Sequence, residues 1–503
     1  MTGDSPRPGA YDPEVTNTTS ESTSPTGPAG SGDLRAAWRA ESALLIGFLM
    51  ILIDSTIVSV ATPAIMTGLR AGVAEVIWVS SAYLLAYAVP LLITGRMGDR
   101  WGPKRLYLIG MTVFTGASLW CGLAGSIGML IIARAVQGLG AAMLSPQTMT
   151  LITRLFPAQK RGAAMGAWGA TAGVATLVGP ILGGVLTSTV GWEWIFFVNV
   201  PIGVIALVMA WRLVPDLPTH PHRFDWPGVV LSGVAMFLIV FGLQEGESLG
   251  WGPQVWSMIV VGAIVMGLFV WWQARTSREP LVPVRLFADR NFGAAGVGVT
   301  LMGMLVTAMP FPMMLWLQDG RGLSASAAAL LTVPSAVVSI VMGPLAGRWI
   351  DSHDPRPVAV AGFGLLALSM VANVIIMGSD TSPLWLLVTS TTMGLASSGI
   401  WSPLSVSATR NLPADLAGAG SGVYNAARQL GAVIGSAAIA ALIANRLGVL
   451  LPGVETSGVR LDEAAQRAYG LAMGEATLLV AICALVGIVV ASLLKPHRGG
   501  SAN

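Results

Sequence analysis

A single carboxylate, Asp54, interrupts the first long apolar run of this sequence. The run extends over residues 42–66, and Asp54-Ser55-Thr56 is its only strongly polar stretch. A lone carboxylate at bilayer depth is costly unless it is paired or protonated, so such residues usually serve a function. We therefore predict that Asp54 binds and releases a proton in a transporter.

Arg134, in the fourth apolar run, is expected to lie at a similar depth. At a rise of about 1.5 Å per residue, Asp54 lies ~12 Å and Arg134 ~10 Å from the outer edge of a core ~30 Å thick. A nearby guanidinium favours a charged carboxylate, whereas apolar surroundings favour a neutral one. Making and breaking this contact could load and release a proton. The alternative is a permanent ion pair that only fixes the first and fourth helices.

The composition is that of a chain that resides in a lipid bilayer. Of 503 residues, 54% are hydrophobic and only 11% are charged, and the mean hydropathy is +0.71, whereas soluble domains carry about 25% charged residues. The net charge is +3, but the basic residues stand singly among apolar runs, which argues against nucleic acid as a partner. The two cysteines lie in apolar runs and do not suggest a disulfide framework.

Apolar runs long enough to cross a membrane as helices recur after residue 40. Each has about 18 to 25 residues, which suffices for a core about 30 Å thick. Fourteen are predicted, near 42–66, 76–94, 106–125, 128–150, 162–186, 194–213, 227–244, 255–273, 292–316, 325–346, 357–377, 384–408, 418–443 and 470–494. Residues 1–40, rich in Ser, Thr, Pro and Gly up to about residue 33, are predicted to be a disordered cytoplasmic tail.

The distribution of Lys and Arg predicts the orientation of these helices. With the N-terminus inside, about 21 basic residues fall on the cytoplasmic side and about 5 on the other, and cytoplasmic loops retain positive charge. We therefore expect a multi-pass protein of a bacterial inner (cytoplasmic) membrane with both termini, including residues 495–503, in the cytoplasm.

Two patterns occur twice in the chain, about 250 residues apart. Gly-Arg-x-x-Asp at 95–99 returns at 347–351, and the small-residue opening of the fifth run at 162–168 resembles that of the thirteenth at 418–424. Matching offsets favour two halves of like orientation. The predicted domains are six-helix bundles at 41–213 and 291–494, with two inserted helices at 214–290.

Several of these segments resemble motifs of the major facilitator superfamily. The loop at 95–105 resembles its signature loop, residues 134–140 its helix-four motif, and residues 173–184 its antiporter motif in helix five. Asp54-Ser55-Thr56 with Ala61-Thr62-Pro63 is similar to the first-helix motif of the fourteen-helix drug:proton antiporter branch. Further matches at 192–203 and 425–431 extend the resemblance over nearly the whole chain after the tail.

The resemblance assigns candidate residues to three motifs. The gating-loop residues are Gly95, Gly98, Asp99, Arg100, Gly102 and Arg105; the helix-four motif contains Arg134, Gln137 and Gly138; the antiporter motif contains Gly173, Gly179, Pro180, Gly183 and Gly184. We expect the loop to hold the outward-open state, with a purely topological role as the alternative. For the glycines, simple helix packing competes with a role in antiport. Two positions depart from the family pattern: Glu193 stands where Arg is common, and residues 352–356 lack the basic run of the first loop.

The clues to a substrate are fewer. The ninth run carries five methionines beside Pro310 and Pro312, which could conform to varied apolar ligands but more often serve as filler. The candidate cavity residues are Trp168, Trp316, Tyr424, Asn425 and Arg428. No second acid comparable to Asp54 is evident at mid-membrane.

These features predict an all-α integral membrane protein with the major facilitator fold and fourteen transmembrane helices. The expected function is proton-coupled multidrug efflux by alternating access. The alternative is an exporter or flippase of an endogenous lipid, siderophore or antibiotic. We expect no enzyme activity, cofactor or metal, because the longest outer loop, about 444–469, offers neither a soluble catalytic region nor clustered acids and His. The lack of a Gly-x-x-x-x-Gly-Lys-Ser/Thr phosphate loop argues against ATP-driven pumping. The expected partners are small hydrophobic substrates, protons and lipid, with a functional monomer.

Overall fold

The computed structural model describes residues 31–219, 225–246, 248–276, 280–379, 381–452 and 462–495, and over these ranges all regular structure is helical. The predicted tail residues 1–30 and 496–503, and the loop histidines His220 and His222, lie outside the described residues.

The first part of the chain forms eight helices. They are α1 (Ser31–Leu69), α2 (Val73–Ala88), α3 (Leu91–Trp101), α4 (Pro103–Gly122), α5 (Ile127–Leu155), α6 (Arg161–Thr189), α7 (Trp194–Phe197) and α8 (Asn199–Leu213). Because α1 begins at Ser31, the prediction that the tail extends to residue 40 is wrong for residues 31–40. Ala37 and Ala40 are buried, and the ring of Trp38 meets that of Phe156 at 5.2 Å, so this segment packs as part of α1.

The second predicted span is broken. Helices α2 and α3 meet at an angle of 46°, and Pro90 stands at the break. A proline inside a helix removes one backbone hydrogen bond and collides with the preceding turn, which explains the bend.

Two helices, α9 (Trp226–Gln244) and α10 (Pro253–Arg275), form a hairpin in the middle of the chain. Helix α9 packs on α10 and also contacts α2 and α17. In the most apolar 18-residue stretch of α10, only 17% is buried, which is the smallest share among the candidate spans. Asp225 ties the hairpin together by accepting hydrogen bonds from Trp272 Nε1 (3.0 Å) and Gln273 Nε2 (2.7 Å).

The last part of the chain supplies the remaining helices. They are α11 (Arg290–Ala308), α12 (Pro310–Leu315), α13 (Ala325–Leu330), α14 (Val333–Ser352), α15 (Pro355–Met377), α16 (Leu386–Thr409), α17 (Ala417–Leu450) and α18 (Glu463–Ser492), with a π-helical turn at Trp316–Gly320 and short 3-10 turns at Ala158–Lys160, Val284–Ala288, Pro383–Trp385 and Ala414–Leu416. Prolines at 310 and 312 interrupt the regular helix between α11 and α12, but Arg290–Gly320 remains one candidate span, in agreement with the run predicted at 292–316. Helices α17 and α18 extend into the loop predicted at 444–469.

Among the described residues, eleven helices are long and apolar enough to cross a membrane, or up to twelve when the bent α2 and α3 pair counts as one span. Helices α4 and α16, both predicted as spans, are not among them. Lys104 and Arg105 stand in the first turn of α4, and α16 is rich in Ser and Thr. The count of fourteen stays a prediction.

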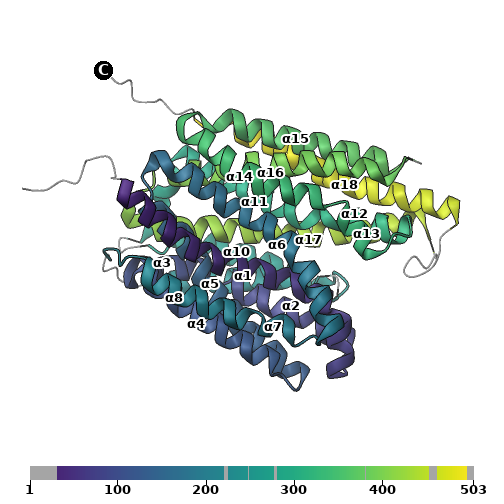
Figure 1. Cartoon of the computed structure of the whole chain (residues 1–503), viewed down its shortest axis with the longest axis horizontal. Coiled ribbons are helices and arrows are strands. Elements are labelled where there is room, and N and C mark those ends of the chain that lie inside the picture. The colour runs from purple at the N-terminus through teal and green to yellow at the C-terminus, as the bar shows by residue number, and fades with distance from the viewer. Residues whose placement is uncertain are drawn as a thin grey trace, which may run out of the picture.

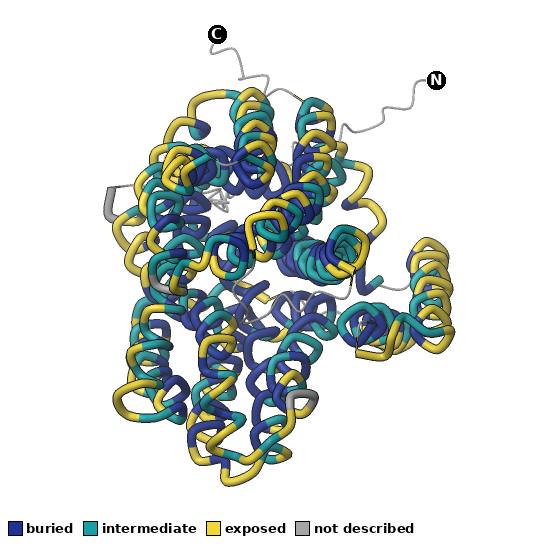
Figure 2. Tube along the Cα trace, turned by 90° about the vertical axis from the view of Figure 1, so that its right-hand side faces the viewer, coloured by how far each residue is buried: buried dark blue, intermediate teal, exposed yellow. Residues whose placement is uncertain are grey.

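The helices form two groups that meet along four helices, α3, α6, α14 and α17. Figure 1 shows α15, α16 and α18 on one side and α2, α4 and α8 on the other, with α6 and α17 between them. Helix α6 packs on α14, and α17 packs on α3. Figure 2 shows buried residues where helices face one another and exposed residues on the perimeter. The sites described below lie in these buried interfaces.

Candidate functional site

Asp54 is completely buried and has three hydrogen-bond donors around its carboxylate. Arg134 Nη1 donates to Asp54 Oδ2 and forms an ion pair with it. Asp54 Oδ1 accepts hydrogen bonds from Gln137 Nε2 at 2.8 Å and from Asn199 Nδ2 at 3.2 Å. The similar depths predicted for Asp54 and Arg134 thus correspond to direct contact. We refer to these four residues as the Asp54 network.

Arg134 is held by further contacts besides its ion pair with Asp54. Its Nε donates to the carbonyl oxygen of Val79 at 3.2 Å, and its guanidinium lies 4.1 Å from the centre of the Tyr83 ring. Arg134 Nη1 also donates to Gln137 Oε1 at 2.6 Å. These contacts fix the orientation of a planar, multiply donating group between α1, α2 and α5.

Local sequence explains how α5 presents this network. Arg134 and Gln137 are three residues apart, which places both on one face of the helix. Gly138 lets α2 approach that face, because a Cβ at this position would overlap the carbonyl oxygen of Tyr83. The small residue of the helix-four motif therefore serves close packing beside the charged pair.

The glycines of the antiporter motif divide between two neighbours of α6. A Cβ at Gly179 would overlap Thr56 Oγ1, and one at Gly183 would lie 2.9 Å from Ile57, so both glycines bring α6 against α1 next to Asp54. Gly173 faces α14 instead, where its Cβ would lie 3.2 Å from Ser339. A Cβ at Gly184 would meet nothing within 4 Å.

A second buried polar group, the central polar cluster, joins α2, α5 and α17. Arg428 Nη2 donates to Tyr87 OH at 3.0 Å, and Tyr87 OH donates to Ser145 Oγ at 2.9 Å. Ser145 Oγ donates in turn to Asn425 Oδ1 at 3.2 Å. The cluster therefore connects the two helix groups, and it contains two of the predicted cavity residues.

Helix α16 brings two more predicted cavity residues close to this cluster. Trp168 meets Trp401 edge to face with ring centres 6.3 Å apart, and Tyr424 OH lies 3.0 Å from Ser405 Oγ. Trp401 and Ser405 are one helical turn apart on α16, so Trp168 and Tyr424 approach the same stretch of that helix.

Trp316 is not brought to the other cavity candidates. A Cβ at Gly303 of α11 would overlap the carbonyl oxygen of Arg428, and Thr307 Oγ1 donates to Ala432 O at 2.9 Å, so α11 and α17 run side by side in the same direction. Trp316 follows Gly303 by thirteen residues, which separates it from Tyr424 by about 25 Å along the bundle. It packs instead beside Gly470 of α18.

The two copies of the Gly-Arg-x-x-Asp pattern make equivalent contacts across the groups. Asp99, at the end of α3, accepts backbone hydrogen bonds from Gly418 (2.8 Å) and Ala419 (2.9 Å) in the first turn of α17. Asp351, at the end of α14, accepts them from Gly162 (2.7 Å) and Ala163 (3.3 Å) in the first turn of α6. Both carboxylates thus cap a helix N-terminus, where negative charge is favourable. This end of the molecule is called the Asp99 end below.

Comparison with known proteins identifies the family. The family model described as Major Facilitator Superfamily matches residues 44–436, and matches again over residues 296–498. The chain belongs to the Major Facilitator Superfamily.

The chain is 50% identical to one relative, the uncharacterized MFS-type transporter Rv1250 of Mycobacterium tuberculosis, over 94% of this chain and 83% of the relative. It is 34% identical to the tetracenomycin C resistance and export protein of Streptomyces glaucescens, over 82% of this chain and 77% of the relative. It is 33% identical to the multidrug resistance protein Stp of M. tuberculosis, over 81% and 76% respectively.

A solved structure shares the fold of this chain. The proton:xylose symporter XylE aligns with a TM-score of 0.61, covering 90% of this chain and 95% of XylE at 14% sequence identity. Members of the superfamily and this structural neighbour are transporters and not enzymes. At this identity the likeness shows the fold alone.

The segment predicted to be a gating loop is mostly helical. Residues 95–101 belong to α3, and the connection to α4 is the single residue Gly102, whose φ of +95° favours glycine. Gly95 and Gly98 serve close approach instead of turning: a Cβ at Gly95 would lie 2.6 Å from the carbonyl oxygen of Gly418, and one at Gly98 would overlap Gln147. Arg100 and Arg105 are exposed.

Sequence reasoning missed several residues of these sites. Asn199 stands among apolar residues in the sixth predicted helix, and this isolated amide was the available signal. Tyr83, Tyr87 and Ser145 gave no comparable signal, because single Tyr and Ser residues are common in membrane helices. Among the described residues, no group of three or more His, Cys, Asp or Glu could hold a metal ion.

Proposed function

We propose that this protein is a drug:proton antiporter that exports hydrophobic or amphipathic compounds across the cytoplasmic membrane by alternating access. The observation that carries the proposal is the Asp54 network, in which a completely buried carboxylate is paired with a buried guanidinium. Idle charges are rarely retained in a membrane core. The names of relatives that are 33 to 34% identical support drug export as the direction of transport.

In this mechanism, Asp54 carries the proton and Arg134 responds to its loss. Protonation of Asp54 removes the charge that holds Arg134, which leaves the guanidinium with Gln137, Val79 O and the Tyr83 ring. Helix α1 is then free to shift relative to α5, and deprotonation restores the pair. The proton enters from outside and leaves inside, while the substrate moves outward.

The contacts at the Asp99 end support an assignment of the structure to an outward-open state. Two helix caps and two close backbone approaches join the groups there: a Cβ at Gly347 would overlap the carbonyl oxygen of Gly162, and Gly95 lies against Gly418. Beyond Gly173, Gly179 and Gly183 of α6 contact α1 instead of α14. We assign the Asp99 end, and both termini, to the cytoplasm because the basic residues gather there.

We further propose that α4 and α16 complete fourteen transmembrane segments. With them, residues 41–213 and 291–494 form two six-helix bundles, and α9 with α10 forms an inserted pair at 214–290. Fourteen segments would place the chain in the fourteen-helix drug:proton antiporter branch. The peripheral position of α10 agrees with a role outside the transport pathway.

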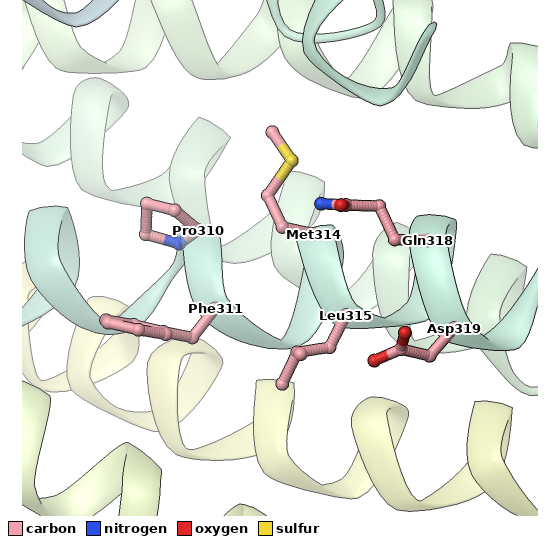
Figure 3. A pocket seen from close by; sticks show the side chains of 6 residues that line it. All are labelled: Pro310, Phe311, Met314, Leu315, Gln318 and Asp319. Atoms are coloured by element: carbon pink, nitrogen blue, oxygen red, sulfur yellow. The ribbon is translucent and has the colours of Figure 1, made fainter. Parts of the chain in front are cut away.

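The substrate path would run from the central polar cluster to a pocket on α12. This pocket encloses about 270 Å³ and is lined by Pro310, Phe311, Met314, Leu315, Gln318 and Asp319. Figure 3 shows Met314 and Gln318 projecting to one side of the helix and Leu315 and Asp319 to the other. An apolar lining with a few polar groups suits amphipathic ligands. Asn425 and Arg428 would supply the polar contacts nearer the centre.

An endogenous cargo is the second candidate. The relative from S. glaucescens carries the name of a resistance and export protein for tetracenomycin C, which favours export of an antibiotic-like metabolite over movement of a lipid.

Everted membrane vesicles from an overexpressing strain test these proposals. A set of chemically diverse dyes and antibiotics is added after an acid-inside pH gradient is formed. Antiport predicts that a substrate dissipates the gradient only in vesicles that contain the protein. Transport that proceeds unchanged after the gradient is collapsed would favour the uncoupled exporter.

A further inference from the structure

A second carboxylate, Glu41, is buried in α1 outside the Asp54 network. Its exposed fraction is 0%, and neither carboxylate oxygen has a hydrogen-bond partner among the described residues. Thirteen residues separate it from Asp54, which corresponds to about 20 Å along the helix. A buried carboxylate without a partner is costly, so its retention calls for a function.

The face of α1 that carries Glu41 leads to an aromatic cluster. Residues 41 and 48 are seven apart and therefore lie on nearly the same face of the helix. Phe48 stacks on Trp168 with ring centres 4.9 Å apart, and Trp401 meets Trp168 edge to face at 6.3 Å. Trp168 Nε1 is buried and has no hydrogen-bond partner in the part of the chain that the structure describes. A carboxylate and an indole N–H that both lack partners thus flank a group of three aromatic rings.

The position of Glu41 on α1 can be related to α6, which packs on α1. Helices α1 and α6 run side by side in the same direction, since Phe48 lies beside Trp168 and Thr56 beside Gly179. Glu41 precedes Phe48 by seven residues. It therefore lies level with the first turn of α6, where Asp351 caps Gly162. This is the end of the molecule that the Asp99 and Asp351 caps hold together.

We propose that Glu41, together with the aromatic cluster of Phe48, Trp168 and Trp401, binds an amphipathic organic cation when the Asp99 end is open. This inference rests on the proposed export function and names a substrate class for it. The cationic head pairs with Glu41, and the apolar body extends about 10 Å along α1 to the rings. The aromatic rings pack against the apolar body, and the apolar setting strengthens the pairing of the cationic head with the carboxylate.

Binding of two probes to the purified full-length protein in lipid nanodiscs tests this site. Ethidium is the cationic probe and N-phenyl-1-naphthylamine the neutral one. Glu41→Gln is expected to weaken ethidium binding by about tenfold or more, because it removes a charge-assisted contact, and to leave the neutral probe within about twofold. Glu41→Asp keeps the charge and should stay within about threefold of wild type for both probes. Glu463→Gln, which removes an exposed carboxylate, is the matched control and should change neither.

The outcomes separate this inference from the export proposal. Unchanged ethidium binding by Glu41→Gln overturns the cation site and leaves drug export standing. Equal losses for both probes show that Glu41 supports packing only, which also overturns the site. A wild-type protein that binds neither probe, and transports neither into everted vesicles, contradicts the export proposal and this inference with it.

Discussion

Asp99 and Asp351 stand 252 residues apart in the sequence and make the same contact, each capping the first turn of a helix in the other group. The contacts cross over: the first copy of the pattern caps α17, and the second caps α6. The second copy keeps this carboxylate although it has lost the basic run of the first. The repeated element is thus an acid that joins the groups at one end, and the positive charge is an addition to the first copy.

Removal of either cap should destabilise the closed Asp99 end. Asp351→Ala leaves the N–H groups of Gly162 and Ala163 without their acceptor and removes a favourable charge from the start of α6. In a cysteine-free background, maleimide labelling of Ala164→Cys, a completely buried position, should accelerate by about tenfold, since each charge-assisted bond contributes about 1.5 kcal/mol or more. Asp99→Ala should also lower transport turnover.

The control for this prediction is Asp354→Ala. Asp354 caps its own helix by accepting a hydrogen bond from Arg356 N at 3.0 Å, so its loss affects α15 and not the join to α6. Labelling that rises equally in both variants, or full turnover by Asp99→Ala, would speak against a gating role for these caps.

Loss of Arg134 should be more damaging than loss of the whole charged pair. Arg134→Gln leaves Asp54 buried without its counter-charge and should lower the free energy of unfolding by about 3–5 kcal/mol. The double variant Asp54→Asn/Arg134→Gln removes both charges and should recover part of this loss. Thermal denaturation in detergent measures both changes.

The exposed pair Arg446 and Glu475 offers the comparison, since both side chains are 41% exposed. Arg446→Gln should cost at most about 1 kcal/mol, as exposed ion pairs usually do. A double variant as unstable as Arg134→Gln alone would mean that Arg134 stabilises the bundle through Tyr83 and Val79, not through Asp54.

Two glycines of the antiporter motif should respond differently to the same substitution. Gly179→Ala forces α6 away from Thr56, two residues from Asp54, and should cost about 1–3 kcal/mol together with a loss of transport. Gly184→Ala adds a methyl group where nothing lies within 4 Å and should be tolerated. Melting temperature and export rate check both. Equal effects would show that the motif acts through something other than contact with α1.

The sequence predicted the helical class, most span positions and the pairing of Asp54 with Arg134, because apolar length and depth along a helix are properties of the chain itself. The repeated Gly-Arg-x-x-Asp pattern was predicted as well, because it too is a property of the chain itself. The crossed contacts of Asp99 and Asp351 could not be predicted, because the pattern gives no information about which helix N-terminus each carboxylate caps.

The failures also have physical causes. Residues 31–40 pack as part of α1 through Ala37, Trp38 and Ala40, although the preceding polar stretch suggested a tail. Trp316 was grouped with Tyr424 by residue type, but the parallel run of α11 and α17 places them at different depths. Glu41 stands directly before the predicted first span, where a carboxylate is expected to be exposed to solvent, and its burial becomes evident only in the folded structure.

Proton movement in proteoliposomes tests the role of Asp54 most directly. With an internal pH dye, addition of a substrate identified in the everted-vesicle assay should produce a pH change with the wild-type protein and none with Asp54→Asn. Exchange of labelled for unlabelled substrate, which needs no proton, should remain in Asp54→Asn and shows that this variant is folded. Substrate-dependent proton movement of wild-type size in Asp54→Asn would contradict the proposed mechanism.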